Sequence, residues 1–579
     1  MNSRRIIFLT IIVALTSCYH KPKDKDFVNS LADLNAQVKK DIGERINYFM
    51  HNPNDAEEDY RTDAVELFYE GRKNESAWCN TGRFSEEADS MFYFVQHVAD
   101  YGLNPKDYFS LRLDTIYDLL TRDTMQRLNA ALWSEGDVLM TDAFMKLCDH
   151  LHFGRLPLDT ISLRKEVSFG DKNLAEMLTK CLTEKNIVQS LKNLEPKYEQ
   201  YHLLKDALKK FKKDFAGMKW DSVPVNFKKD TTLFKKKLIA RLKQSHDYDS
   251  TITDDERGRI KVALKSFQKK WNLESDGKVG IITVRALNYT VADRVKEIEL
   301  NLDRWRQMPD SLGKEYVLVN LPGFYFELWD DDTMRLESKI ICGKPKNPTP
   351  LLNSHLTDIR LYPYWQVPWS ITWKEMIPAV QHDTGYLRKT RMDVIDSKGE
   401  VVENPQELPW KKFSKNYFPY KFRQREGNDN SLGIIMFNFN NVYIVYMHDT
   451  NARSLFGLWM RALSHGCVRV QKWEDYARWV LLPDSLKYPK DTLSNWFASG
   501  IKRNIPVKHR VGVYFRYFTC AVKDGKLLFF DDMYGYDAQI LWKNRLQEDQ
   551  IKTPVKKTPK KKTAMLFFGE GKLKKEKYF

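Results

Sequence analysis

The chain has 579 residues, a length that predicts about three domains. Its residues are 42% hydrophobic and 13% aromatic, a composition that excludes a disordered protein. Its formal net charge of +16 favours anionic surroundings such as nucleic acid, acidic lipid or a cell-wall polymer. Because no zinc-finger, RRM or KH fingerprint is evident, we expect no nucleic-acid partner.

The first residues have the pattern of an export signal. Arg4 and Arg5 precede an apolar run over residues 6–15, which is too short to span a bilayer but suits a secretory signal. The run ends in LTSC, which resembles a bacterial lipobox and implies a signal peptide over 1–17 and lipidation of Cys18. An ordinary signal peptide with a chance cysteine is the alternative. We expect a membrane-anchored lipoprotein of the cell envelope, in the periplasm.

The remaining cysteines stand at irregular spacings without a CxxC pair. They are Cys79, Cys148, Cys181, Cys342, Cys467 and Cys520. A chain of this size folds without disulfides. Since a catalytic Cys467 has to be free, we expect most of the others to be small buried hydrophobes.

A polar, lysine-rich stretch precedes a helical region. We expect a lipid-anchored linker over residues 18–45 and a helical domain over 46–225, because apolar residues recur there at helical spacing. His150 and His152 are two positions apart and cannot share a helix face, so structural roles are favoured for both.

Residues 232–290 are predicted to form three short helices. The segment FQKKWNLESDGKVGIITVRALN, at 267–288, resembles the small peptidoglycan-binding domain of many wall enzymes. Asp254–Asp255–Glu256 stands where that family has a glycine-bearing turn, so a bare three-helix packing module is the alternative.

A β-rich region follows, with short apolar runs between Gly, Pro and Asp turns. The predicted strands are Tyr316–Asn320, Tyr325–Trp329, Leu336–Cys342, Asn441–Met447, Val511–Val522 and Leu527–Phe530. A proline-rich insertion over 372–428 is predicted to be a lid, and residues 473–482 an amphipathic helix. Residues 511–550 are expected to add C-terminal strands and a helix, and the basic segment 551–579 to be disordered.

A histidine at the end of one predicted strand and a cysteine next to a glycine are the residue types that thiol-based acyl transfer needs. His448 and Cys467 are 19 positions apart, which allows a loop to leave a strand and return. An imidazole that accepts the thiol proton lowers a thiol pKa from ~8.5 to within ~3.5–7.5. Backbone N–H groups around Gly466 and Cys467 can stabilise an oxyanion, while a carboxylate or carbonyl near His448 can orient its ring. Structural roles for His448 and Cys467 are the alternative.

Several segments together resemble the L,D-transpeptidase (YkuD-type) catalytic domain. They are YVLVNLPGFYFELWD, ICGKPKNPTPLL, HDTNARSLF, RALSHGCVRV and, near the end, DDMYGYD. A large bacterial subgroup of this family also has a helical scaffold domain, to which YGLNPKDY is similar. The resemblance implies a multidomain α+β protein: a β-rich catalytic domain over 298–510 with the lid, an all-α scaffold domain and a three-helix peptidoglycan-binding domain.

The resemblance also implies an activity, the formation of 3→3 cross-links in peptidoglycan through a cysteine thioester with a tetrapeptide stem, with release of D-Ala. Cys467 would be the nucleophile, His448 the proton donor and acceptor, the backbone carbonyl of Asp449 its orienting group, and Gly466 part of the oxyanion hole. Ser464, His465 and Arg469 would bind substrate. The implied partners are stem peptides, the membrane and other cell-wall enzymes, with no metal or organic cofactor.

Other functions use the same residues. Water in place of the acceptor amine gives an L,D-carboxypeptidase, and an inactive catalytic domain leaves a wall-binding lipoprotein scaffold. A papain-like protease is not favoured, because its histidine follows the cysteine, whereas His448 precedes Cys467.

Overall fold

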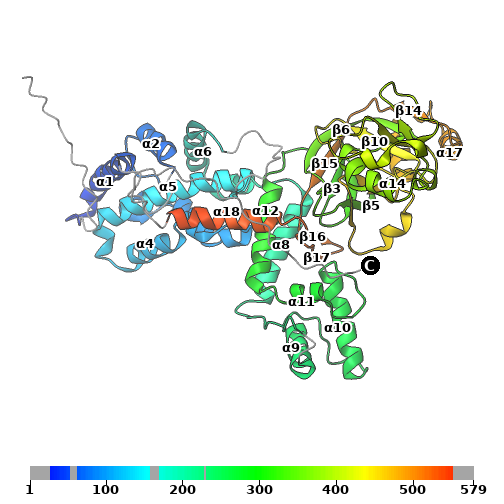
Figure 1. Cartoon of the computed structure of the whole chain (residues 1–579). Coiled ribbons are helices and arrows are strands. Elements are labelled where there is room, and N and C mark those ends of the chain that lie inside the picture. The colour runs from blue at the N-terminus through cyan, green and yellow to red at the C-terminus, as the bar shows by residue number, and fades with distance from the viewer. Residues whose placement is uncertain (1–26, 52–60, 157–167, 227–229, 552–579) are drawn as a thin grey trace, which may run out of the picture.

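The computed structural model describes residues 27–51, 61–156, 168–226 and 230–551 (Figure 1). The predicted signal peptide, Cys18 and the basic tail after Ile551 lie outside these ranges. Within them, no helix combines the length and the apolar character needed to cross a bilayer.

The N-terminal part is helical and has one hydrophobic core. Its helices are α1 (Leu31–His51), α2 (Thr62–Gly71), α3 (Glu86–Gln96), α4 (Ser110–Arg122), α5 (Ala130–Phe153), α6 (Asp171–Glu184), α7 (Ile187–Lys192) and α8 (Glu199–Asp214). A short hairpin, β1 (Cys79–Asn80) and β2 (Arg83–Phe84), and the 3-10 turns η1 (Val98–Tyr101), η2 (Pro105–Tyr108) and η3 (Gln126–Leu128) connect them. Helix α5 is buried along nearly its whole length. The Asn129 side chain caps α5 by accepting the Leu132 N–H at 3.1 Å, and the helix ends before Gly154, whose φ of +89° suits glycine.

The predicted linker over 18–45 is wrong in its second half. Helix α1 begins at Leu31, and its Leu34, Val38 and Ile42 are buried in the same core as α2 and α5. These residues recur at helical spacing, so α1 gains stability from one apolar face, and any tether has to end before residue 31.

Three helices follow, as predicted for 232–290. They are α9 (Thr231–Gln244), α10 (Glu256–Lys270) and α11 (Ile281–Leu287). The next helix, α12 (Val291–Arg306), starts at a capping box formed by Thr290 and Asp293. The predicted domain boundary at 298 therefore falls inside a continuous helix.

The part predicted to be catalytic is built on one mixed sheet, called the catalytic sheet below. Its strands are β3 (Glu315–Asn320), β4 (Tyr325–Asp330), β5 (Thr333–Gly343), β6 (Leu352–Leu361), β10 (Ile435–Phe439), β11 (Met447–His448), β12 (Ala462–Ser464), β13 (Val468–Val470), β14 (Arg503–Pro506) and β15 (Val511–Arg516). The strand order is β10-β11-β13-β5-β4-β3-β15-β6-β14. Strand β10 also pairs with β6, so the sheet closes into a ring of strands from β10 to β6. Apolar side chains of these strands pack with α16 (Trp473–Val480), the short turn η8 (Leu482–Asp484) and α17 (Lys490–Ala498).

Two predicted strands differ from the structure. The run Asn441–Met447 forms a strand only at Met447–His448, because Ile444 adopts a positive φ of 56° and residues 442 and 443 form a turn. The run Val511–Val522 is broken into β15 and β16 (Cys520–Lys523). Since β15 pairs with β3 and β6, it belongs to the catalytic sheet and not to a separate C-terminal unit.

The insertion predicted as a lid is a small subdomain with its own core. It begins before residue 372, because β7 (Trp365–Gln366) pairs with β9 (Lys421–Gln424), which pairs with β8 (Met392–Ile395). Its helical segments are α13 (Trp369–Ile371), the π-helix η4 (Thr372–Met376), α14 (Ile377–His382), α15 (Tyr386–Lys389), η5 (Pro405–Glu407) and η6 (Trp410–Lys412). Aliphatic and aromatic residues together fill the core of this subdomain. From here on it is called the lid.

A C-terminal hairpin joins the parts of the chain. Strand β16 pairs with β17 (Lys526–Phe529), and α18 (Tyr536–Ile551) follows. One apolar cluster contains side chains of α8, α9 to α12, β3 and this hairpin. Figure 1 shows α8 and α12 side by side between the scaffold helices, the catalytic sheet and the three-helix module, with the hairpin beside them.

Candidate active site

Strands β11 and β13 bring the two predicted catalytic residues into neighbouring positions. They pair in parallel, with Met447 opposite Val468 and His448 opposite Arg469. The Val468 N–H donates to the Tyr446 carbonyl at 3.1 Å, so the same register extends to Tyr446 and Cys467. Because side chains alternate along a strand, Tyr446, His448, Cys467 and Arg469 share one face. A local turn between Arg453 and Gly457 (η7) lies in the connection.

The imidazole of His448 is buried and held in one orientation. Its Nδ1 lies 2.5 Å from the carbonyl oxygen of Asp449, the contact that the family resemblance implies. A carbonyl oxygen only accepts, so Nδ1 carries the proton and Nε2 is the basic nitrogen. Burial and, next, the charge of Arg469 lower the pKa of His448 to about 3, against a smaller opposing effect of the Asp449 and Leu432 carbonyls. The ring is therefore neutral at neutral pH.

The carboxylate of Asp449 stabilises the loop that carries His448. It accepts from the Arg453 guanidinium at 2.8 and 3.2 Å and from the Ile434 N–H at 3.2 Å. A Cβ atom at Gly433 would lie 2.2 Å from this carboxylate, and Gly433 has a φ of +63°, so glycine is required there. The side chain of Asp449 thus holds the backbone whose carbonyl orients His448.

The thiol of Cys467 is half-buried and protonated at neutral pH. Burial raises the pKa of this thiol, while the neighbouring Tyr446 and the charge of Arg469 lower the pKa by less. The expected lowering of the pKa by an imidazole is therefore wrong in direction. A neutral thiol beside a neutral imidazole suits proton transfer during attack and not a standing ion pair.

Tyr446 is a residue of this site that sequence reasoning missed. Burial and, next, the nearby Cys467 thiol raise the pKa of its hydroxyl, while the Trp365 indole of the lid lowers this pKa by less. The Tyr446 ring lies edge-on to the His448 imidazole, with centroids 5.7 Å apart. The available signal was its position two residues before His448 on one strand, which places both side chains on the same face.

The loop before Cys467 is shaped by Ser464 and Gly466. The Ser464 hydroxyl accepts the Gly466 N–H at 3.1 Å and donates to the Cys467 carbonyl at 2.6 Å. Gly466 has a φ of +127°, and no heavy atom outside its immediate chain neighbours would lie within 4 Å of a Cβ there, so the loop borders open space. Because the Gly466 N–H is already bonded, the predicted oxyanion donor at Gly466 is not free. In the described part of the chain no acceptor is bonded to the Cys467 N–H.

The other predicted substrate-binding residues differ in their surroundings. His465 is exposed, and its Nε2 lies 2.6 Å from Glu375 Oε1 in η4, so it links the loop to the lid. Arg469 shares the face of His448, its buried Nε has no hydrogen-bond partner, and it forms no ion pair with any residue that the structure describes. These surroundings favour anion binding by Arg469 over a structural salt bridge.

Comparison with known proteins identifies two families in the chain. Residues 63–208 match the family described as a scaffold domain, and residues 314–495 match the family described as the L,D-transpeptidase catalytic domain, YkuD. The second match contains Cys467 and His448.

Two individual proteins are similar to parts of the chain. A curated protein of Haemophilus influenzae, named "Putative L,D-transpeptidase", is 31% identical over 245 residues, or 42% of this chain and 49% of that protein. The chain thus spans about half the length of this relative. The solved structure titled "Structure of the Ldtfm-avibactam carbamoyl enzyme" aligns with 46% of this chain and 84% of its own at 11% identity. Its TM-score is 0.16.

Proposed function

We propose that this protein cross-links peptidoglycan stem peptides, since residues 314–495 match the L,D-transpeptidase catalytic domain, YkuD, and residues 63–208 match a scaffold domain. The observation that carries the proposal is the strand pair β11–β13. It holds a neutral His448, with Nδ1 on the Asp449 carbonyl, one strand away from a half-buried Cys467 thiol. A general base beside a thiol at open space is what acyl transfer requires.

In the first half-reaction, the Cys467 sulfur attacks the carbonyl carbon of the third residue of a tetrapeptide stem. A C–S bond forms, and the carbonyl electron pair moves to oxygen. The thiol proton passes to Nε2 of His448. Collapse of the oxyanion breaks the C–N bond to D-Ala, and the imidazolium gives its proton to the leaving amine. A thioester on Cys467 and free D-Ala result.

In the second half-reaction, the side-chain amine of the third residue of another stem attacks the thioester. His448 takes a proton from the amine, a C–N bond forms and the C–S bond breaks. The thiolate that leaves regains the proton from the imidazolium, which restores the neutral pair. The product is a 3→3 cross-link. The positive charge of Arg469, next to His448 on this face, suits the carboxylates of a stem peptide.

The test is incubation of the purified protein with disaccharide-tetrapeptides, followed by mass spectrometry. Loss of D-Ala with formation of dimers supports transpeptidation. Loss of D-Ala with monomers alone supports the L,D-carboxypeptidase. A wild-type protein that releases no D-Ala, or a Cys467→Ala variant that releases it normally, contradicts the proposal.

We also place this reaction at a membrane of the cell envelope, in the periplasm, through lipidation of Cys18. The support is the LTSC sequence after a short apolar run. Several acyl chains, at ~0.8 kcal/mol per buried methylene, would hold the protein firmly to a bilayer. The expected result is partition of the expressed protein into the detergent phase. A Cys18→Ala protein that partitions in the same way contradicts the anchor.

A further inference from the structure

A chain of buried and partly buried hydrogen bonds connects the C-terminal segment to the loop of the nucleophile. The Tyr534 hydroxyl donates to the Gly343 carbonyl at 2.7 Å and accepts the Thr349 N–H at 3.2 Å. The Thr349 side chain is fully buried, and its hydroxyl accepts the Gly343 N–H at 2.8 Å and donates to the Gly466 carbonyl at 2.7 Å. These contacts end on the peptide group that joins Gly466 to Cys467.

Fixing one side of that peptide group fixes the other. The peptide is planar and trans, so its C=O and N–H point in opposite directions. With the Gly466 oxygen held by Thr349, the Cys467 N–H points away from Thr349. That N–H has no acceptor in the described part of the chain, whereas the Gly466 N–H is bonded to Ser464. The amide of Cys467 is therefore the loop donor left for an oxyanion.

We propose that Thr349 and Tyr534 are positioning residues, which hold the Gly466–Cys467 peptide so that the Cys467 N–H donates to the oxyanion formed during acyl transfer. This inference rests on the proposed acyl transfer to Cys467. Neither residue touches substrate. Both act by fixing the direction of the Cys467 N–H. A donor that already points at the oxyanion stabilises it strongly, because the donor does not have to reorient during the reaction.

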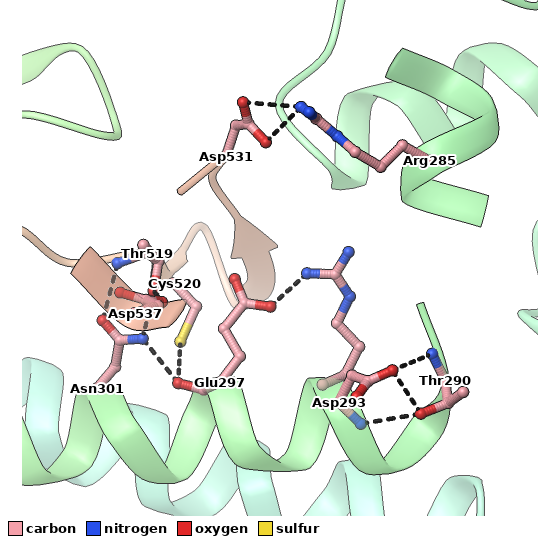
Figure 2. A network of polar contacts seen from close by, with 10 residues as sticks. Arg285, Thr290, Asp293, Glu297, Asn301, Thr519, Cys520, Asp531 and Asp537 are labelled. Carbon is pink, nitrogen blue, oxygen red and sulfur yellow. Dashed lines mark hydrogen bonds and ion pairs between the residues drawn. The ribbon is translucent and has the colours of Figure 1, made fainter. Parts of the chain in front are cut away.

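The position of Tyr534 is itself fixed from both sides. Its N–H donates to the Tyr517 hydroxyl at 2.8 Å, and that hydroxyl donates to Asp532 at 2.8 Å. Asp531 forms a two-pronged ion pair with Arg285 of α11, at 2.9 and 3.0 Å (Figure 2).

On the other side, the Asp537 carboxylate accepts from the Thr519 hydroxyl and from the Arg304 guanidinium of α12, each at 2.6 Å. Figure 2 shows Asp537 and Thr519 above α12, beside Asn301, which donates to Thr519 at 2.8 Å. The segment 531–537 is thus bound to α11 and α12 at its ends, and Tyr534 in its middle contacts Thr349, which in turn bonds to the nucleophile loop at Gly466.

Two reagents that attack the same thiol separate oxyanion stabilisation from thiol access. With p-nitrophenyl acetate, the Cys467 sulfur bonds to the carbonyl carbon and the carbonyl pair moves to oxygen. Collapse of that oxyanion expels p-nitrophenolate with the electron pair of the C–O bond, and the thiol proton goes to His448 and then to solvent. With iodoacetamide, sulfur displaces iodide from a methylene carbon, and no oxyanion forms. Both products are followed at Cys467 by mass spectrometry of the full chain.

The variants remove or keep one hydroxyl at a time. We expect Thr349→Val to slow acylation by about 10- to 100-fold while alkylation changes by less than about twofold, because loss of a whole oxyanion donor costs ~10²–10³-fold. Thr349→Ser keeps the hydroxyl and restores acylation. Tyr534→Phe slows acylation by a smaller factor and serves if the valine variant does not fold. Tyr443→Phe, which removes an exposed hydroxyl elsewhere in the catalytic part, is the matched control.

Acylation and alkylation that fall together would mean that the loop or the thiol has moved as a whole, and this overturns the proposal. Unchanged acylation in Thr349→Val and Tyr534→Phe overturns it too, as does a serine variant that fails to restore acylation. A wild-type thiol that is alkylated but never acylated also overturns it. If Thr349-dependent acylation occurs but tetrapeptides release no D-Ala, the positioning roles stand and the proposed substrate fails.

Discussion

Helix α5 of the scaffold and the strand pair β11–β13 contain the same kinds of reactive side chain. In α5, Cys148 and His150 lie two positions apart, and burial, the largest cause, lowers the pKa of His150 to about 3 and raises that of Cys148. In the strand pair, burial likewise lowers the pKa of His448 to about 3 and raises that of Cys467. Shifted pKa values therefore do not separate a catalytic site from a structural core here.

The two regions differ in space and in bonding. His150 Nδ1 is bonded to the Tyr108 hydroxyl at 2.7 Å, and Cys148 is fully buried among apolar side chains. In the strand pair, Cys467 is half-buried, and Gly466 borders open space. A thiol becomes a candidate nucleophile only where a substrate can reach it and an N–H donor is left for the oxyanion.

The largest expected effect comes from exchanging the two thiols for alanine. Cys467→Ala removes the nucleophile and should lower D-Ala release on the order of 10³-fold or more. Cys148→Ala should leave that rate unchanged and cost about 1–2 kcal/mol of stability, since it removes one buried sulfur. Turnover with disaccharide-tetrapeptides and thermal unfolding measure the two. A large loss of turnover in folded Cys148→Ala would break the comparison.

Substitution of the two histidines should likewise affect catalysis at His448 and stability at His150. His448→Gln removes the general base, so we expect a loss of ~10²–10⁴-fold in kcat. His150→Gln weakens a partly buried hydrogen bond to Tyr108 and should cost ~1–3 kcal/mol of unfolding free energy without a change in kcat. Steady-state kinetics and denaturant unfolding are the measurements. Equal kinetic losses in both variants would mean that α5 takes part in the chemistry.

The pH dependence of alkylation tests the protonation state of Cys467. Because burial raises the pKa of this thiol and lowers that of His448, both groups are neutral at neutral pH. The thiolate fraction, and with it the rate of reaction with iodoacetamide, should rise about tenfold per pH unit between about pH 6 and 8. Cys148 should not react in the folded protein. A rate at Cys467 that is constant over this range would reveal a thiolate–imidazolium pair and contradict the neutral state.

The smallest expected effect concerns the lid. Glu375→Gln keeps the shape of the side chain but weakens its contact with His465, and since both groups are partly exposed the contact is worth ~0–1 kcal/mol. We expect KM for the tetrapeptide to change by no more than about fivefold and kcat to stay constant. Glu407→Gln, a change elsewhere in the lid, is the control. A large fall in kcat would assign His465 a part in the reaction.

The sequence alone determined the local features of this protein. Apolar residues at helical spacing predicted the scaffold helices and the three helices between 231 and 287, and short apolar runs predicted β3, β4 and β5. The motif around Cys467 and the spacing to His448 pointed to the catalytic pair. The helix and strand predictions hold because helix and strand preferences are encoded within a few neighbouring positions, while the catalytic pair stays a prediction.

Only the tertiary structure decided which of the reactive groups are free. The fold brings Thr349 to Gly466, 117 positions away in the sequence, and Tyr534 to Gly343, 191 positions away. No local sequence pattern predicts such contacts. The same holds for the bond between Gly466 and Ser464, which engages one N–H, and for the core that encloses Cys148. Burial and hydrogen bonding depend on every element that packs around a group, so the bonding state of each thiol and N–H follows from the fold as a whole.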